Sequence, residues 1–435
     1  AFNRAIDAGD REVALGIAAD LALHRWVTGT VGEGYRWLES AFACPGATAP
    51  FTLGWALMWR GFLGYLSGNA DDADAQFAEG IALLRAHAGP VFEAYAMSFR
   101  AQIATEAGQP ERAAAILAAA HEVLSGAADD PWVRAFRTWL QAGLALRRDV
   151  DAASHEALLR RVIPELRLAG DEFMTAVCLD LVAEFDEATG AIDAAITQRS
   201  EALDIVTNLR MARFEAALLA RLGASSVLVG ADAAAEQHLR AAMSLASDLK
   251  AAPVRAMALN ALGDLRRRGG RLDEAENAAL AAFDLYDAAG PRFSGSFSRA
   301  TAAFDVPVGL ATSTSVLGFV ATARGDTSLA IEWQRQSFRH AHLAGQPRAL
   351  AVALVGLAAA TAASGDGRWA ARLLGAADQL RRKSGALAAQ REQEDADAVR
   401  RRAQALLGAN YAHEYERGGQ LAPEDVVNQG AADPE

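Results

Sequence analysis

The sequence LNALGDLRRRGGRLDEAENAALAAFDLY, residues 259–286, contains two helix-forming segments separated by a pair of glycines. Glycine readily adopts the left-handed conformation that ends a helix, so Gly270 marks the end of the first segment. The Asp-Glu pair that follows favours the N-terminus of a second helix. Small residues such as Gly263 let two helices approach closely, while larger ones such as Leu262 and Phe283 fill the space around them. The stretch therefore predicts two packed helices joined by a tight turn.

This turn recurs along the whole chain at a nearly constant spacing. Successive turns are separated by 39, 40, 40, 42, 40, 40, 55 and 40 residues. A fixed period of this size is the signature of a solenoid, in which each helical unit packs only against its neighbours. The turns lie at Gly29, Gly68, Gly108, Arg148-Asp149, Gly190, Gly230, Gly270, Gly325 and Gly365.

The repeat and the composition together predict the fold class and the domain organisation. We expect an all-α solenoid of about nine helix pairs over residues 1–417, closed by a helical cap over residues 376–417. No run of alternating β-branched residues bounded by turns is present, which argues against strands. Residues 418–435 are polar and show no periodicity, so we expect them to form a frayed tail.

Charge, cysteine content and hydropathy restrict the environment and the partners. The net charge of −12 argues against a nucleic-acid-binding surface, because phosphate binding needs a basic footprint. Cys44 and Cys178 lie far apart in apolar helical context, which indicates free buried thiols and a reducing compartment. The chain contains no uninterrupted run of 18 apolar residues, so its hydropathy predicts no membrane span. We therefore expect a cytoplasmic protein without direct contact to nucleic acid or membrane.

The repeats resemble those of the tetratricopeptide family. A Leu-Gly pair in the first helix, a Gly-Asp turn and an alanine five residues later match its consensus, as at Leu317-Gly318, Gly325-Asp326 and Ala330. The period is longer than the family's usual length of about 34 residues, so each helix is extended by about one turn. The resemblance implies a right-handed superhelix with a concave groove.

Both ends of the chain resemble a more specific class of proteins. The sequences GDGRWAARLLGAAD at 365–378, ALLG at 405–408, YERG at 415–418 and LAPEDVV at 421–427 are similar to the terminal region of large bacterial transcriptional regulators. In these regulators, which carry LuxR- or SARP-type effectors, a signal-transduction ATPase of the STAND class precedes a tetratricopeptide-like sensor. The sequence WLESA at 37–41 resembles the first repeat of such sensors.

The resemblance implies that this chain is the C-terminal sensor of a longer regulator. Such a sensor holds a neighbouring ATPase inactive until an inducer or a partner protein binds, which is a shift between two populated states. The chain contains no Gly-x-x-x-x-Gly-Lys-Ser/Thr phosphate loop, so ATP as cofactor and DNA binding are expected only in upstream domains. A protein-interaction scaffold without a small ligand is the main alternative, and an enzyme is the other.

One interval breaks the period. The 55 residues between Gly270 and Gly325 include about 15 extra residues, which we assign to an insertion loop over residues 290–308. Insertions in repeat proteins form loops that often lie on the binding face. The alternative is a flexible excursion without a role in binding. The insertion offers cations and aromatic rings as candidate ligand contacts at Arg292, Phe293, Phe297 and Arg299.

Alignment of the repeats on the glycine turn places two further sets of side chains toward the groove. The candidate contacts are Trp55, Phe62 and Tyr65 in the second pair and Asn260, Asp264 and Arg267 in the seventh. Exposed aromatic rings would suit a flat metabolite or an apolar partner helix, although at helical spacing they more often form a core. Polar groove residues are compatible with a ligand or with solvent.

Catalytic chemistry has little support in the sequence. The eight histidines are isolated, except for His340 and His342, which point to different faces of a helix. No Ser-His-Asp or Cys-His set is recognisable. We therefore predict no catalytic residues, no metal site and no enzymatic activity.

Overall fold

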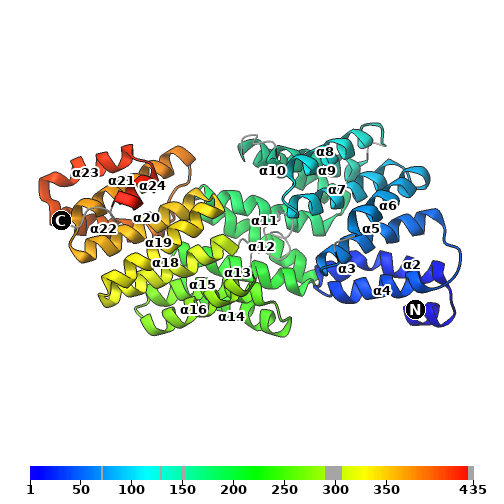
Figure 1. Ribbon diagram of the computed structural model, residues 1–435, viewed down its shortest axis with the longest axis horizontal. Coiled ribbons are helices and arrows are strands. Elements are labelled where there is room, and N and C mark those ends of the chain that lie inside the picture. Colours follow the sequence, from blue (N-terminus) through cyan, green and yellow to red (C-terminus); the bar gives the residue numbers. More distant parts are fainter. Residues whose placement is uncertain (70–71, 128–129, 148–151, 290–305, 430–435) are drawn as a thin grey trace. The chain divides into compact units, whose positions relative to one another are not determined.

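The computed structural model describes residues 1–69, 72–127, 130–147, 152–289 and 306–429. Every regular element in these residues is helical (Figure 1). The α-helices are α1 (Phe2–Asp7), α2 (Arg11–Asp20), α3 (Ala22–Val27), α4 (Val31–Ala43), α5 (Pro50–Leu66), α6 (Ala73–His87), α7 (Pro90–Glu106), α8 (Pro110–Val123), α9 (Pro131–Arg147), α10 (Ala152–Ala169), α11 (Glu172–Ala188), α12 (Ile192–Asn208), α13 (Ala212–Leu228), α14 (Asp232–Asp248), α15 (Ala252–Arg268), α16 (Leu272–Ala289), α18 (Val306–Arg324), α19 (Thr327–Ala344), α20 (Pro347–Ser364), α21 (Gly367–Ser384), α22 (Gln390–Leu407), α23 (Tyr411–Gln420) and α24 (Pro423–Gln429).

The described residues form two compact units. The N-terminal unit comprises residues 1–182 and 204–214, and the C-terminal unit comprises residues 183–203, 215–289 and 306–429. Within each unit, consecutive helices pack against each other as pairs, and successive pairs stack side by side. This arrangement confirms the predicted all-α class, because each pair buries its apolar face against the pairs before and after it.

The turn glycines adopt the conformation that the sequence pattern requires. Eight of the nine predicted turns lie in described residues, and all eight glycines have φ between 71° and 97°. Side chains with a Cβ rarely adopt this left-handed region, whereas glycine enters it at little cost. The remaining turn, at Arg148-Asp149, lies outside the described residues. The predicted pairs correspond to α3–α4, α5–α6, α7–α8, α9–α10, α11–α12, α13–α14, α15–α16, α18–α19 and α20–α21.

The aspartate that follows the turn glycine has its own structural role. The carboxylate of Asp326 accepts a hydrogen bond from the backbone N–H of Leu329 at 3.1 Å, at the start of α19. Asp366 accepts the corresponding bond from the N–H of Trp369 at 2.9 Å, at the start of α21. Each aspartate thereby satisfies one of the N–H groups that a helix start leaves unpaired. The Gly-Asp dipeptide therefore ends one helix and begins the next.

Replacement of a turn glycine that has no close neighbours reports the free-energy cost of the left-handed backbone conformation alone. Nothing lies within 4 Å of the position that a Cβ would take at Gly108. We therefore expect Gly108→Ala to lower the free energy of unfolding by about 1–2 kcal/mol, through backbone strain alone. Gly16 is the matched control, because it lies inside α2 with equally open surroundings. Gly16→Ala should stabilise by about 0.5–1 kcal/mol, and urea unfolding curves that shift alike for both variants would contradict the assignment.

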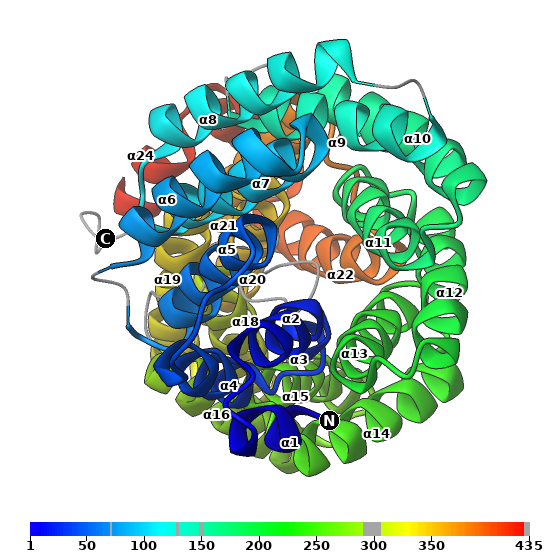
Figure 2. The ribbon, with the colours of Figure 1, turned by 90° about the vertical axis from the view of Figure 1, so that its right-hand side faces the viewer.

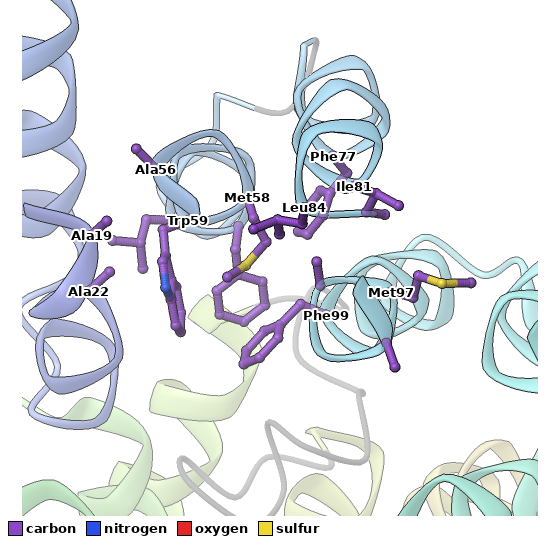
Figure 3. Close-up of a cluster of buried hydrophobic side chains, with 14 of the residues drawn as sticks. Ala19, Ala22, Ala56, Met58, Trp59, Phe77, Ile81, Leu84, Met97 and Phe99 are labelled. Carbon is purple, nitrogen blue, oxygen red and sulfur yellow. The ribbon is translucent and has the colours of Figure 1, made fainter. Parts of the chain in front are cut away.

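The core of the N-terminal unit lies between its successive helix pairs. Trp59, Phe62 and Phe77 are among its largest fully buried side chains. Figure 3 shows Trp59 and Met58 of α5 gathered with Phe99 of α7 in this core, with side chains of α6 packed beside them. Small alanines lie among these rings in the core, and small side chains let helices approach closely.

The C-terminal end differs from its prediction. The sequence suggested a frayed tail from residue 418, yet α23 continues to Gln420 and α24 follows it. Val427 is buried in the core of the C-terminal unit, and Leu421 packs against that core. Helix α23 also approaches α21 so closely that a Cβ at Gly418 would meet the backbone oxygen of Arg372. So short a segment has too few apolar positions to show a periodicity, which is why the pattern missed it.

One boundary and one expectation about membrane spans also need adjustment. Residues 306–308, assigned to the insertion loop, form the first turn of α18, and residues 290–305 lie outside the described residues.

Helices α18 and α20 are long and apolar enough to cross a membrane by length and composition, although neither is an uninterrupted apolar run. Two thirds of each apolar window is buried against other parts of the structure, as in the central helices of a helical stack.

Candidate binding surfaces

The aromatic residues of the N-terminal unit form a buried inner set. Phe62 is 1% exposed and makes edge-to-face contacts with Trp26 and Phe99, at centroid distances of 5.0 and 4.8 Å. Trp59 packs against the same Phe99 ring at 5.0 Å. Phe62 therefore lies in the core rather than on an accessible groove, in agreement with the core alternative for the aromatic cluster.

A second set of aromatic side chains forms a partly exposed row across three helices. Trp55 of α5, Tyr95 of α7 and Trp132 of α9 are each half-buried, and their ring centroids are 5.6 and 6.4 Å apart along the row. Phe51 and Phe92 extend the row, and each is 37% exposed. These helices are the first members of three consecutive pairs, so the repeat itself places the rings side by side.

Two members of this aromatic row, Tyr95 and Trp132, are held by burial and by a polar contact. The indole N–H of Trp132 donates to the Asp171 carboxylate at 3.0 Å, which orients the ring. Burial raises the pKa of the Tyr95 hydroxyl well above its usual range, with a smaller contribution from the Asp171 charge, so this hydroxyl stays protonated. Tyr65, also a predicted contact, is half-buried in the last turn of α5, whereas Trp55 lies in the first half of that helix.

In the C-terminal unit, the predicted contact Asn260 serves as a link between helices. Its side-chain N–H donates to the carbonyl of Gly309 at 2.8 Å, and its side-chain oxygen accepts from the Ser313 hydroxyl at 2.7 Å. Both hydrogen-bonding ends of the buried amide are therefore used between α15 and α18. Asn260 holds these two helices together, and this use of both ends leaves it poorly placed to contact a ligand.

The other two predicted contacts, Asp264 and Arg267, belong to a compact ion network. Asp264 accepts from Arg267 at 2.6 Å and from Arg268 at 2.9 Å, and both arginines also bind Asp395 of α22, at 3.0 and 2.9 Å. Arg267 stacks over the Phe319 ring at 4.4 Å. Burial alone would raise the pKa of Asp264, but the two guanidinium charges outweigh it and lower the pKa to about 2.

Helix α22 makes further polar contacts with other repeats of the same unit. Arg391 binds Asp232 at the start of α14 at 3.2 Å, and Glu392 binds Arg348 at the start of α20 at 3.0 Å. Arg348 also donates to the backbone carbonyl of Glu187 at 3.0 Å. We call the surface that α22 and the preceding Leu387 cover the α22 seat, and it consists of Gly190, Gly230, Asp232, Arg267, Arg268 and Arg348.

Sequence reasoning found Arg267 but not its partner on α22. Arg267 and Asp395 are 128 residues apart, and α22 lies outside the repeat that guided the alignment. The only available signal was the unusual density of charges in QREQED, residues 390–395, at the start of α22. The structure thus brings Asp264 and Arg267 together, and it places Asn260 about one turn before Asp264 on the same helix, α15.

The structure describes only some of the remaining predicted residues. The insertion residues Arg292, Phe293, Phe297 and Arg299 lie outside the described residues. Within the described ranges, no group of three His, Cys, Asp or Glu side chains is arranged to hold a metal ion. Cys44 and Cys178 are buried and free, and burial raises the pKa of the Cys178 thiol, so this thiol remains protonated and unreactive.

Paired helices, left-handed glycine turns and lateral stacking define a tetratricopeptide-like helical-repeat domain. No protein-family model and no curated protein matches the sequence. Among solved structures, a Rap protein complexed with Competence and Sporulation Factor is 13% identical, with 92% of this chain and 99% of that chain covered and a TM-score of 0.47.

Two further solved structures are similar to this chain over most of its length. A STAND protein with a tetratricopeptide repeat sensor from Pyrococcus horikoshii is 12% identical, with 90% of this chain and 54% of that chain covered and a TM-score of 0.45. Yeast Tom70 is 11% identical, with 97% and 96% covered and a TM-score of 0.32. This chain thus spans about half the length of the STAND protein. The likenesses concern the fold alone.

Proposed function

We propose that this chain is a sensor domain of a bacterial transcriptional regulator. In this role it binds an inducer or a partner protein and thereby controls a neighbouring ATPase and DNA-binding region. The observation that carries the proposal is the aromatic row of Phe51, Trp55, Phe92, Tyr95 and Trp132, which remains partly exposed although it is large and apolar. An exposed apolar patch on a folded domain marks a surface for a ligand or a partner.

The regulatory part of the proposal rests on sequence. The segment at 365–378, which resembles the terminal region of STAND-type regulators, spans the turn and the first two thirds of α21, and most of its side chains are buried. The segment therefore supports an assignment to that class of module without adding a binding site. The ATP-dependent step belongs to an upstream domain in this proposal, and the chain acts by binding rather than by catalysis.

A protein-interaction scaffold is the second candidate, and the same aromatic row supports it. Rings at successive first helices also fit an apolar helix of a partner, because side chains of such a helix can lie between them. A sensor should be stabilised by an added small molecule, whereas a scaffold should be stabilised by an added protein partner. Binding to the folded state alone raises stability in proportion to the logarithm of ligand concentration over its dissociation constant.

Thermal-shift screening separates the candidates. We expect at least one small metabolite to raise the melting temperature, and we expect Trp55→Ala to abolish the shift, because the ring provides the contact area. Trp333→Ala is the matched control, since this half-buried tryptophan lies in α19 of the other unit and should leave the shift intact. If no metabolite acts while an added ATPase domain of the same regulator does, the scaffold replaces the sensor.

A further inference from the structure

The first turns of α22 are attached mainly by polar contacts, while its second half packs against the apolar core of the unit. Its buried apolar side chains are Ala396, Val399 and Ala403, which are small and offer little area for burial. The contacts of its first half are the ion pairs of Arg391, Glu392 and Asp395 with the seat, together with a hydrogen bond from Arg268 to the carbonyl of Arg391 at 3.1 Å. Polar contacts of this kind exchange readily for contacts with water or with another polar partner.

The turns beneath α22 differ from the other turns of the C-terminal unit. At Gly190 a Cβ would meet Leu387 at 2.7 Å, and at Gly230 it would meet the Arg391 side chain at 3.1 Å. At Gly270, Gly325 and Gly365 nothing lies within 4 Å. The repeat generates equivalent turns, and the two covered ones are covered by the α22 region, the segment that does not belong to the repeat.

A short connection without regular structure joins α21 to α22. Gly385 ends α21 with φ of 70°, and residues 386–389 form no regular element before α22 begins. Leu387 is 65% exposed although it touches Gly190. Glu392 also accepts a hydrogen bond from the N–H of Ala389 at 3.0 Å, so one N–H group at the start of α22 is paired within its own segment. Figure 2 shows α22 in orange beside α20 and α21 of the same unit.

We propose that the α22 seat is a protein-binding surface for a charged partner helix, and that α22 is its displaceable intramolecular occupant. The contacts define the partner. A competing helix presents two carboxylates three residues apart, toward Arg348 and toward the Arg267–Arg268 pair, and an arginine toward Asp232. This is the pattern Arg-Glu-x-x-Asp that α22 itself carries at 391–395. The inference deepens the proposed function, on which it rests for binding as the role of the chain, by naming a surface and a class of partner.

Charge reversal at Asp395 tests the attachment in the full chain. Asp395→Arg places a third guanidinium beside Arg267 and Arg268, while Asp264 still pairs with both, so the fold is retained. We expect amide hydrogen exchange in residues 390–395 to accelerate at least about tenfold, with exchange in α13 and α15 unchanged. Asp397→Arg is the matched control, because within the described residues Asp397 pairs with Gln393 and Arg400 of α22 itself. Unchanged protection of α22 in Asp395→Arg would overturn the proposal.

A labelled peptide with the sequence of residues 386–407 tests the seat as a binding surface. We expect it to bind the Asp395→Arg protein at least about tenfold more tightly than the wild-type protein, whose seat is occupied, as measured by fluorescence anisotropy. A peptide that itself carries Asp395→Arg should not bind. Equal binding of both peptides, or failure of the wild-type peptide to bind the opened protein, would refute the inference. Neither measurement uses an inducer or the aromatic row, so failure here is distinguishable from failure of the proposed function.

Discussion

Replacing Phe62 by alanine is expected to lower the free energy of unfolding by about 3–5 kcal/mol. The ring is 1% exposed and lies between Trp26 and Phe99, each of which meets it edge to face. Its removal forfeits the transfer free energy of a large apolar side chain and leaves a cavity that three surrounding helices cannot close. The loss is therefore greater than for a half-exposed ring in the same unit.

Urea unfolding of Phe62→Ala checks this value, and Phe51→Ala provides the comparison. Phe51 is 37% exposed and belongs to the partly exposed aromatic row, so its removal should cost about 1 kcal/mol or less. A larger loss of unfolding free energy in Phe62→Ala than in Phe51→Ala distinguishes a core position from a position in the exposed row. If Phe51→Ala destabilised as much as Phe62→Ala, the separation of the aromatic cluster into a buried set and an exposed row would be wrong.

The fold was predictable because its decisive signal is local. A left-handed turn needs glycine, and glycine at one position of each unit makes the period visible without any knowledge of distant contacts. The structure confirms this at Gly68, Gly230 and Gly365, for example, where φ is 89°, 77° and 97°. The segment after residue 417 lacked such a mark. Helix α24 is held by tertiary burial of Val427, which no local pattern announces.

The candidate sites were less predictable, because they depend on exposure and on distant partners. Trp55 and Phe62 are both aromatic residues on α5, yet one is half-buried in the exposed row and the other lies in the core. Their difference arises from how α5 packs against α3 and α7, which periodicity alone does not determine. Arg267 was assigned to the groove without its partner Asp395, because no periodic signal connects α15 with α22.

The ion network of α15 should be the most sensitive polar feature of the C-terminal unit. Asp264→Asn is expected to lower the free energy of unfolding by about 3 kcal/mol at pH 7, because it leaves Arg267 and Arg268 buried with Asp395 as their only carboxylate. Asp273→Asn is the matched control. Asp273 is 94% exposed and pairs with Arg324 in solvent, where such a pair contributes little or nothing measurable.

The pH dependence of the difference in unfolding free energy between wild type and Asp264→Asn tests whether the charge of Asp264 is its cause. The pKa of Asp264 is lowered to about 2 in the folded protein, against about 3.9 in an unfolded chain. A lowered carboxyl pKa contributes stability that is fully present above the unfolded value and is lost as the pH falls toward the folded one. Urea unfolding should therefore show a constant gap between wild type and Asp264→Asn above about pH 4.5, and a gap that narrows by about 2–3 kcal/mol toward pH 2. A gap that stayed constant down to pH 2.5 would mean that the asparagine weakens packing, and that the carboxylate does not hold the two arginines by its charge.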